Sequence, residues 1–194
     1  MGDESGRLTF VTDDIGARYL DEARRSLRGN KRLAEGALAQ ISDEEFFRAP
    51  DQESNSIAVI VKHIAGNARA RFTDFLSTDG EKPWRHRDTE FEIDKDDTRA
   101  SLMEFWEAGY KIAFDTIASL KPEDLKRTVT IRGAEHSVLQ AIHRATAHYA
   151  YHIGQIVFLA KHWRGREWKT LSIPRGKSDE AGQEMEQKLR ERAK

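Results

Sequence analysis

The chain has 194 residues and no cysteine, and its 32 basic and 33 acidic residues leave a formal net charge of −1. This length allows one domain with a sizeable core. The balanced charge argues against nucleic acid or an anionic membrane as partner, and the lack of cysteine excludes disulfides and thiolate ligands. The amino terminus, MGDESGRLTF, resembles no signal peptide and no run approaches the length of a membrane span, so we expect a cytoplasmic protein.

Two segments with helical periodicity occupy the first part of the chain. The first runs from about Asp13 to Gln40 and repeats apolar residues at intervals of three and four. The second follows the N-cap candidates Ser54–Ser56 and extends to about Leu76. It contains His63 in the stretch IVKHIAGN. A histidine in such an apolar run is either a hydrogen-bonded core residue or a ligand.

The segment from Ser77 to Asp97 shows no periodicity and is long for a link between neighbouring antiparallel helices. A third helix is predicted from about Thr98 to Leu120, and a small hairpin at Thr128–Ile131 before Arg132-Gly133. A long crossover lets the second and third helices run parallel. We therefore expect an all-α four-helix bundle with up-down-down-up order.

The fourth predicted helix, from about Ser137 to Trp163, carries the most informative pattern in the chain. Its apolar stripe includes His148 and His152, in AHYAYHIGQI. Residues four apart lie about 6 Å from each other along a helix and point the same way, so one ion can bridge the two rings. Imidazole is a good ligand for zinc, nickel, copper and iron.

A third histidine can complete this site. If the second and fourth helices pack antiparallel, His63 faces the turn that holds His148 and His152, and three neutral imidazoles leave coordination positions for water or substrate. The alternative is that all three only fill the core. The other four histidines of the chain are not candidate ligands, because they point to another side of their helix, lie too far along it, or are predicted in loops. They are His86, His136, His143 and His162.

Residues one or two turns from the three histidines are candidates to support a ligand or to contact substrate: Asn67, Arg71, Tyr151 and Gln155. The amides of Asn67 and Gln155 can hydrogen bond a ligand imidazole or a bound water. Hydrogen bonds between helices are the alternative role for these amides. No carboxylate stands out as a general base, so the catalytic residues stay unknown.

The segments NSIAVIVKHIAGN, RFTDFLSTDGEKPWR, HYAYHIGQIVFLAKHW and LSIPRGKS, in this order, resemble one branch of the DinB-like (YfiT-related) superfamily of bacterial four-helix-bundle metalloproteins. The resemblance implies the up-down-down-up bundle, a homodimer, and His63, His148 and His152 as a site for a divalent ion, most often nickel or zinc. We expect one domain over residues 1–194, with the helical core at about 12–163 and a carboxy-terminal extension at 164–194.

Relatives in this superfamily include thiol-dependent transferases and isomerases. The resemblance therefore implies a metal-dependent enzyme that transfers a low-molecular-weight thiol to a small electrophile. A metal-dependent hydrolase and a non-catalytic, metal-stabilised bundle are the alternatives. The basic aromatic stretch Lys161–Lys169 is short and contains Glu167, so we expect a small-molecule substrate and neither nucleic acid nor a membrane as partner.

The resemblance also draws attention to several arginines in or beside these segments, which can bind the carboxylates of a thiol cosubstrate or pair with nearby acids: Arg69, Arg71, Arg85, Arg87 and Arg175. Ion pairing is the preferred interpretation for most of them. Arg71, eight residues after His63, is the one expected to reach the site.

Overall fold

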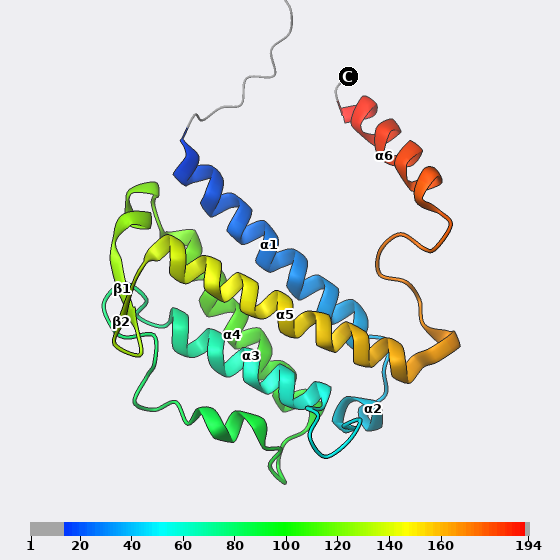
Figure 1. Ribbon diagram of the computed structural model, residues 1–194, viewed down its shortest axis with the longest axis horizontal. Coiled ribbons are helices and arrows are strands. Elements are labelled where there is room, and N and C mark those ends of the chain that lie inside the picture. The colour runs from blue at the N-terminus through cyan, green and yellow to red at the C-terminus, as the bar shows by residue number, and fades with distance from the viewer. Residues whose placement is uncertain (1–13, 193–194) are drawn as a thin grey trace, which may run out of the picture.

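The computed structural model describes residues 14–192, and most of these residues are helical (Figure 1). The all-α prediction is confirmed in this broad sense, and the predicted hairpin is present as a small antiparallel sheet. The elements in chain order are α1 (Ile15–Leu38), α2 (Asp43–Phe47), α3 (Ile57–Phe72), η1 (Arg87–Phe91), α4 (Arg99–Ser119), η2 (Pro122–Lys126), β1 (Thr128–Ile131), β2 (Ala134–Ser137), α5 (Val138–Arg164), η3 (Gly165–Glu167) and α6 (Ser178–Arg192).

Side-chain caps define where the helices begin. The hydroxyl of Ser56 accepts a hydrogen bond from the backbone N–H of Val59 at the start of α3, and Ser137 forms a reciprocal capping box with Gln140 at the start of α5. The prediction that the second helix extends to Leu76 is wrong. α3 ends at Phe72 because the next residue is extended and Asp74 then adopts a φ of +49°.

The four long helices pack side by side around one core. α3 packs most extensively on α4, and α1 on α5, while α3 also contacts α5 (Figure 1). Gly109 permits the close approach of α3 and α4, because a Cβ atom there would lie 2.8 Å from the backbone oxygen of Ala65. Large side chains that are fully buried fill the space between these helices, among them Trp106, Tyr110 and Tyr149.

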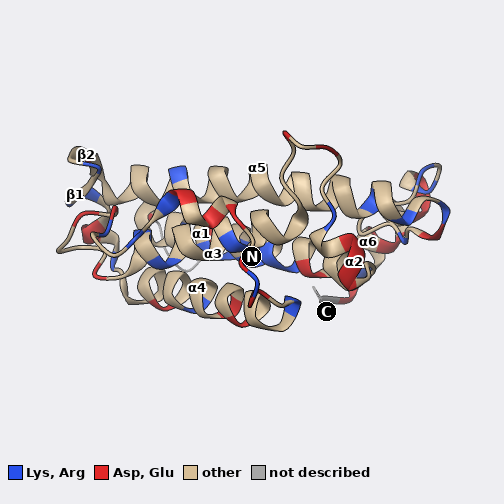
Figure 2. Cartoon of the chain, turned by 90° about the horizontal axis from the view of Figure 1, so that it is seen from below, with Lys and Arg blue, Asp and Glu red and all other residues tan. Residues whose placement is uncertain are grey.

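The crossover between α3 and α4 forms a cover over one side of the bundle. Its η1 segment packs against α3, and Lys62 of α3 donates hydrogen bonds to Asp94 and Asp97 at the far end of the crossover (2.9 and 2.8 Å). Figure 2 shows charged residues on the outer faces of the helices and in the connections, whereas α5 contains no acidic residue. This covered side is where α3 and α5 bring their histidines together.

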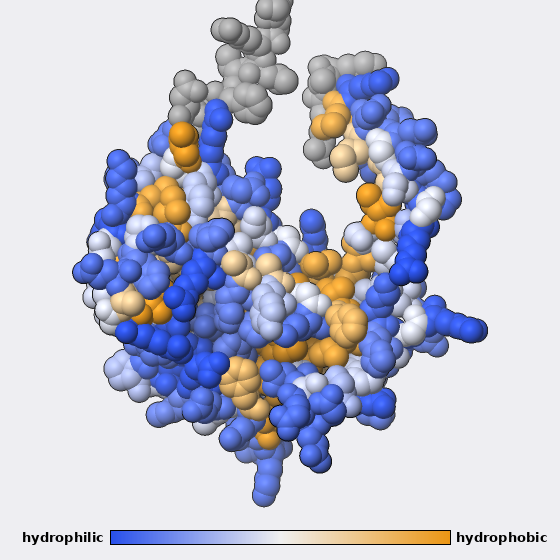
Figure 3. Space-filling model, viewed as in Figure 1, coloured by the Kyte–Doolittle hydropathy of each residue, from blue (hydrophilic) through white to orange (hydrophobic). Residues whose placement is uncertain are grey.

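The predicted carboxy-terminal extension contains one further long helix. This helix, α6, projects from the bundle in Figure 1 and in the space-filling view of Figure 3, and it leaves Met185 and Leu189 about 60% exposed (62% and 60%). Within the described residues, no helix is both long and apolar enough to cross a membrane.

Candidate metal centre

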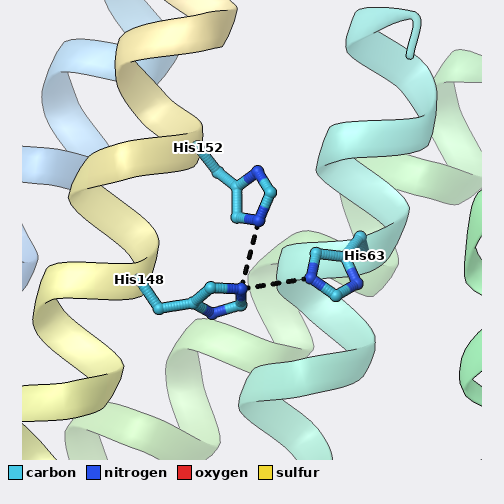
Figure 4. A group of neighbouring side chains, drawn as sticks. All are labelled: His63, His148 and His152. Carbon is cyan, nitrogen blue, oxygen red and sulfur yellow. Dashed lines mark hydrogen bonds between the residues drawn. The ribbon is translucent and has the colours of Figure 1, made fainter. Parts of the chain in front are cut away.

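Three imidazoles converge between α3 and α5. The Nε2 atom of His148 lies 3.2 Å from Nε2 of His63 and 3.1 Å from Nε2 of His152 (Figure 4). Ligating atoms of the three residues all lie within 4.8 Å of one another. Nitrogen ligands at 2.0–2.1 Å from one ion are separated by roughly 2.9 Å in octahedral and 3.3 Å in tetrahedral geometry, so the observed spacing suits a shared ion.

A hydrogen bond at Nδ1 determines the tautomer of two of the three imidazoles, those of His63 and His152. Nδ1–H of His63 donates to a carboxylate oxygen of Glu90 (2.9 Å), and Nδ1–H of His152 donates to the amide oxygen of Gln155 (2.8 Å). In the neutral ring the opposite nitrogen then carries no proton. Nε2 of both rings therefore presents a lone pair toward His148.

Glu90 is a buried carboxylate held in place by Arg85. Nε and Nη2 of Arg85 donate to the two carboxylate oxygens (2.7 and 2.8 Å), and the side chains of Arg85 and Glu90 are only 2% and 8% exposed. Burial raises the pKa of Glu90, but the hydrogen bonds from His63 and Arg85 outweigh it and hold the pKa below its ordinary value. Glu90 thus stays ionised and can orient His63.

The glycine in HIAGN makes room for this carboxylate. A Cβ atom on Gly66 would lie 2.4 Å from Oε1 of Glu90, which is too close for any real contact. The absence of a side chain one turn from His63 therefore lets η1 approach α3 and place Glu90 against the imidazole. Phe91, the next residue in η1, stacks on His63 with ring centroids 4.7 Å apart.

Burial keeps His148 and His152 neutral. Desolvation, together with the neighbouring His152 and His63, lowers the pKa of His148 to about 3. Desolvation also lowers the pKa of His152, against the hydrogen bond to Gln155, which raises it. A neutral imidazole is the form that ligates metal, so these rings are ready to bind at neutral pH.

Three imidazole nitrogens suit a divalent cation of intermediate hardness, such as zinc or nickel. His148 can place at most one proton between its Nε2 and its two neighbours, so at least one of the two close nitrogen–nitrogen contacts has no hydrogen bond along it. A cation at the centre gives all three nitrogens a favourable contact. The carboxylate–histidine pair on one side and the amide–histidine pair on the other are typical of residues that orient metal ligands.

A cavity of about 190 Å³ opens beside the histidines. His63 and His148 form part of its wall together with Asn67, Arg71 and further residues of α5 and the hairpin. Its volume corresponds to roughly six water molecules at 30 Å³ each. A small molecule, or one arm of a larger one, fits in this space beside His63 and His148.

The residues predicted to surround the histidines lie in different places. Gln155 contacts His152 directly, and Asn67 lines the cavity while its side-chain oxygen accepts a hydrogen bond from the hydroxyl of Tyr149 (3.2 Å). Arg71 also lines the cavity, and it donates to Gly80 O and Glu81 (2.5 and 3.2 Å). Tyr151 is 64% exposed, with its ring edge-on to His152 at 4.9 Å.

The other arginines mostly follow the ion-pairing or stacking interpretation. Arg85 pairs with Glu90, Arg69 lies over the ring of Trp84 (4.7 Å), and Arg175 is exposed. Arg87 lies over Phe91 (4.8 Å), and it also lines the cavity.

Of the excluded histidines, His136 was placed wrongly in a loop. It lies in β2, where hairpin pairing sets it opposite Val129, and its Nε2 is 3.4 Å from Nη1 of Arg144. His143 is exposed on α5, as its position on the helix predicts.

Comparison with known proteins adds a family to this geometry. The model of the family described as "protein of unknown function (DUF1572)" matches residues 14–177. The chain belongs to this family. The matched region contains α1 to α5, and with them all three histidines, Glu90 and Arg85, and it stops before α6. A search of curated proteins finds no match.

Proposed function

We propose that the chain is a metal-dependent enzyme of the DinB-like superfamily that binds one divalent ion, nickel or zinc, through His63, His148 and His152. The order of the four long helices would then be the up-down-down-up order of that superfamily, and the functional unit a cytoplasmic homodimer. The observation that carries the proposal is the convergence of three Nε2 atoms, two of them fixed as lone pairs by Glu90 and Gln155.

The chain's own residues would have distinct tasks. Glu90, held by Arg85, keeps the proton of His63 on Nδ1, and Gln155 does the same for His152. The cavity bordered by Asn67 admits a small molecule to the inward face of the rings. A bound divalent ion would supply Lewis acidity, which polarises a substrate or lowers the pKa of a bound water or thiol.

Transfer of a low-molecular-weight thiol to a small electrophile is the reaction we propose, on the resemblance to thiol-dependent relatives. The absence of cysteine is compatible with this reaction, because the thiol would come from solution. The same centre could activate water, so metal-dependent hydrolysis is the second candidate; the buried, ionised Glu90 would then act through His63. We propose no role in binding nucleic acid or membranes.

Elemental mass spectrometry tests the metal centre. Protein purified without a nickel column should hold close to one ion per chain, and His152→Ala should lose it. His143→Ala replaces an exposed histidine of the same helix and should keep the metal. A metal-free wild type that also fails to take up added nickel or zinc would overturn the proposal.

A second measurement separates an enzyme from a metal-stabilised bundle. The metal-loaded protein is exposed to a small thiol, and the absorption spectrum of its nickel form is followed. A thiolate-to-nickel charge-transfer band would support an open coordination position beside the cavity. An unchanged spectrum at saturating thiol would favour the hydrolase or the structural role.

A further inference from the structure

The cavity beside the histidines is lined by four arginines from four different segments. Arg71 comes from α3, Arg87 from η1, Arg132 from the hairpin turn and Arg144 from α5. The other lining residues are His63, Asn67, Ile131, Ala141, Ala145 and His148, so no carboxylate of the described residues lines this cavity. Guanidinium groups brought together from distant parts of a sequence form a region of positive potential over the candidate centre.

Nearby acids neutralise this group only in part. Arg87 pairs with the exposed Asp88 (3.5 Å). Glu81 is shared by three guanidinium groups, those of Arg71, Arg85 and Arg132, at 3.2, 3.3 and 2.8 Å. Glu90 is already engaged by Arg85 and His63.

Arg144 differs from the other three arginines, which each form an ion pair with Glu81 or Asp88. Within the described part of the chain no carboxylate lies within ion-pair distance of it, and its closest polar partner is Nε2 of His136 at 3.4 Å. Its own helix offers no counter-ion, since α5 contains neither Asp nor Glu. Several of its N–H donors are therefore available to a ligand.

Arg132 has a backbone conformation that is unfavourable for an arginine. It has a φ of +56° and precedes Gly133 at +73°, a turn that Asn-Gly would adopt more readily than Arg-Gly. Asp79 stabilises the turn, because its carboxylate accepts from the backbone N–H groups of Arg132 and Gly133 (2.9 and 2.8 Å). An arginine in this position, with its side chain at the cavity, indicates a use for the guanidinium itself.

We propose that Arg132 and Arg144, with Arg87, bind an oxyanion group of the substrate, a carboxylate or a phosphate, and hold the molecule with its other end at the histidines. The inference deepens the proposed function and rests on it. Arginine suits this task because its planar fork can donate two parallel hydrogen bonds to either group. The cavity limits the bound part to a few non-hydrogen atoms, as in a short-chain organic acid.

Isothermal titration calorimetry of the nickel-loaded protein with succinate, and separately with inorganic phosphate, tests this assignment. The neutral diamide succinamide is the control ligand. We expect saturable binding of at least one anion and at least tenfold weaker binding of succinamide, as the loss of charge-assisted hydrogen bonds implies. The tighter anion identifies the carboxylate or the phosphate as the recognised group.

Variants separate recognition from general charge effects. Arg132→Asn suits the turn and should leave the melting temperature unchanged or raised, yet weaken anion binding about tenfold, and Arg144→Gln should weaken it similarly. Lys161→Gln removes a positive charge from the far end of α5 and should change nothing. Anion binding that is absent, equal to that of succinamide, or unaffected in both arginine variants would overturn the inference.

Nickel content is measured on the same samples. Protein that holds nickel but binds neither anion contradicts only the arginine assignment. Protein that takes up no nickel contradicts the proposed function, and with it the inference drawn from it.

Discussion

The two helices that supply the histidines support them by different means. On the α3 side, a charged chain runs from Arg85 through Glu90 to His63, and all three side chains are almost fully buried. On the α5 side, His152 has a neutral amide partner, Gln155, and Nδ1 of His148 has no hydrogen-bond partner among the described residues. The candidate centre thus has buried, charged partners on one side and a neutral partner on the other.

This difference suggests a division of roles. Buried ion pairs with good geometry hold a ring in one orientation, and their disruption is costly because a charge is left without a partner. A neutral amide can be replaced or can move with a smaller penalty. Both sides border the cavity, through His63 and His148, so a ligand bound there would meet the charged side as well as the neutral side.

The largest expected effect comes from removing the charge on the α3 side. Glu90→Ala leaves the guanidinium of Arg85 buried without its main acceptor, and we expect the free energy of unfolding of the metal-free protein to fall by about 3–5 kcal/mol. Urea unfolding measures this change. Glu135→Ala, at an exposed position of β2, should shift it by no more than about 0.5 kcal/mol. A loss for Glu90→Ala as small as that would show that the charged chain contributes little.

A second prediction concerns the space next to Glu90. In Gly66→Ala the new methyl group displaces the carboxylate from His63, so metal affinity should fall by about ten- to a hundredfold, the effect typical of losing a partner that orients a ligand. Competition with a chelating dye measures the affinity. Gly154→Ala on α5 is the matched control, because a Cβ atom there meets nothing within 4 Å. It should stabilise the helix by about 1 kcal/mol and leave affinity unchanged.

Gln155→Ala tests the neutral side and should have a smaller effect. Without the amide, the ring of His152 loses its hydrogen bond and can adopt either tautomer, so metal affinity should fall by at most about tenfold. The same dye competition gives the value. If Gln155→Ala weakens binding more than Gly66→Ala does, the proposed difference between the two sides is wrong.

A further prediction concerns the pH dependence of stability without metal. The pKa of His148 is lowered to about 3 in the folded chain, and an unfolded histidine titrates near 6.5. The unfolded state therefore binds the extra proton, and stability is fully present above about pH 6.5 and declines as the pH falls toward 3. In His148→Gln the proton uptake on unfolding near pH 5 should drop by about one. Urea unfolding across this range measures the slope, and His143→Gln should keep the slope of the wild type.

Much of the helical framework could be predicted from the sequence. Apolar periodicity and cap residues located the four long helices, and the positions of His63, His148 and His152 on apolar stripes were enough to expect them near one another. The end of α3 was harder to predict, because the apolar periodicity of the sequence continues to Phe75 although the backbone turns at Asp74. Local geometry of this kind has no signature in hydrophobic patterning.

Arg71 was predicted to reach the site, but Glu90, Arg132 and Arg144 could not be predicted as part of it. Glu90 lies 27 residues after His63, in a crossover without periodicity, and looked like one of several acids available for ion pairing. Gly66 was the only local signal, since a glycine inside a buried helix indicates that something approaches closely. Arg132 and Arg144 reach the cavity only through the packing of the hairpin against α5, which depends on long-range contacts.

X-ray absorption spectroscopy at the metal edge of the nickel- or zinc-loaded protein tests the central claim most directly. The account predicts a first shell that contains three imidazole nitrogens, recognisable from the outer-shell scattering of the rings, with the remaining positions filled by oxygen. One imidazole should disappear in His152→Ala and none in His143→Ala. A first shell of oxygen alone, or a spectrum identical in wild type and His152→Ala, would contradict it.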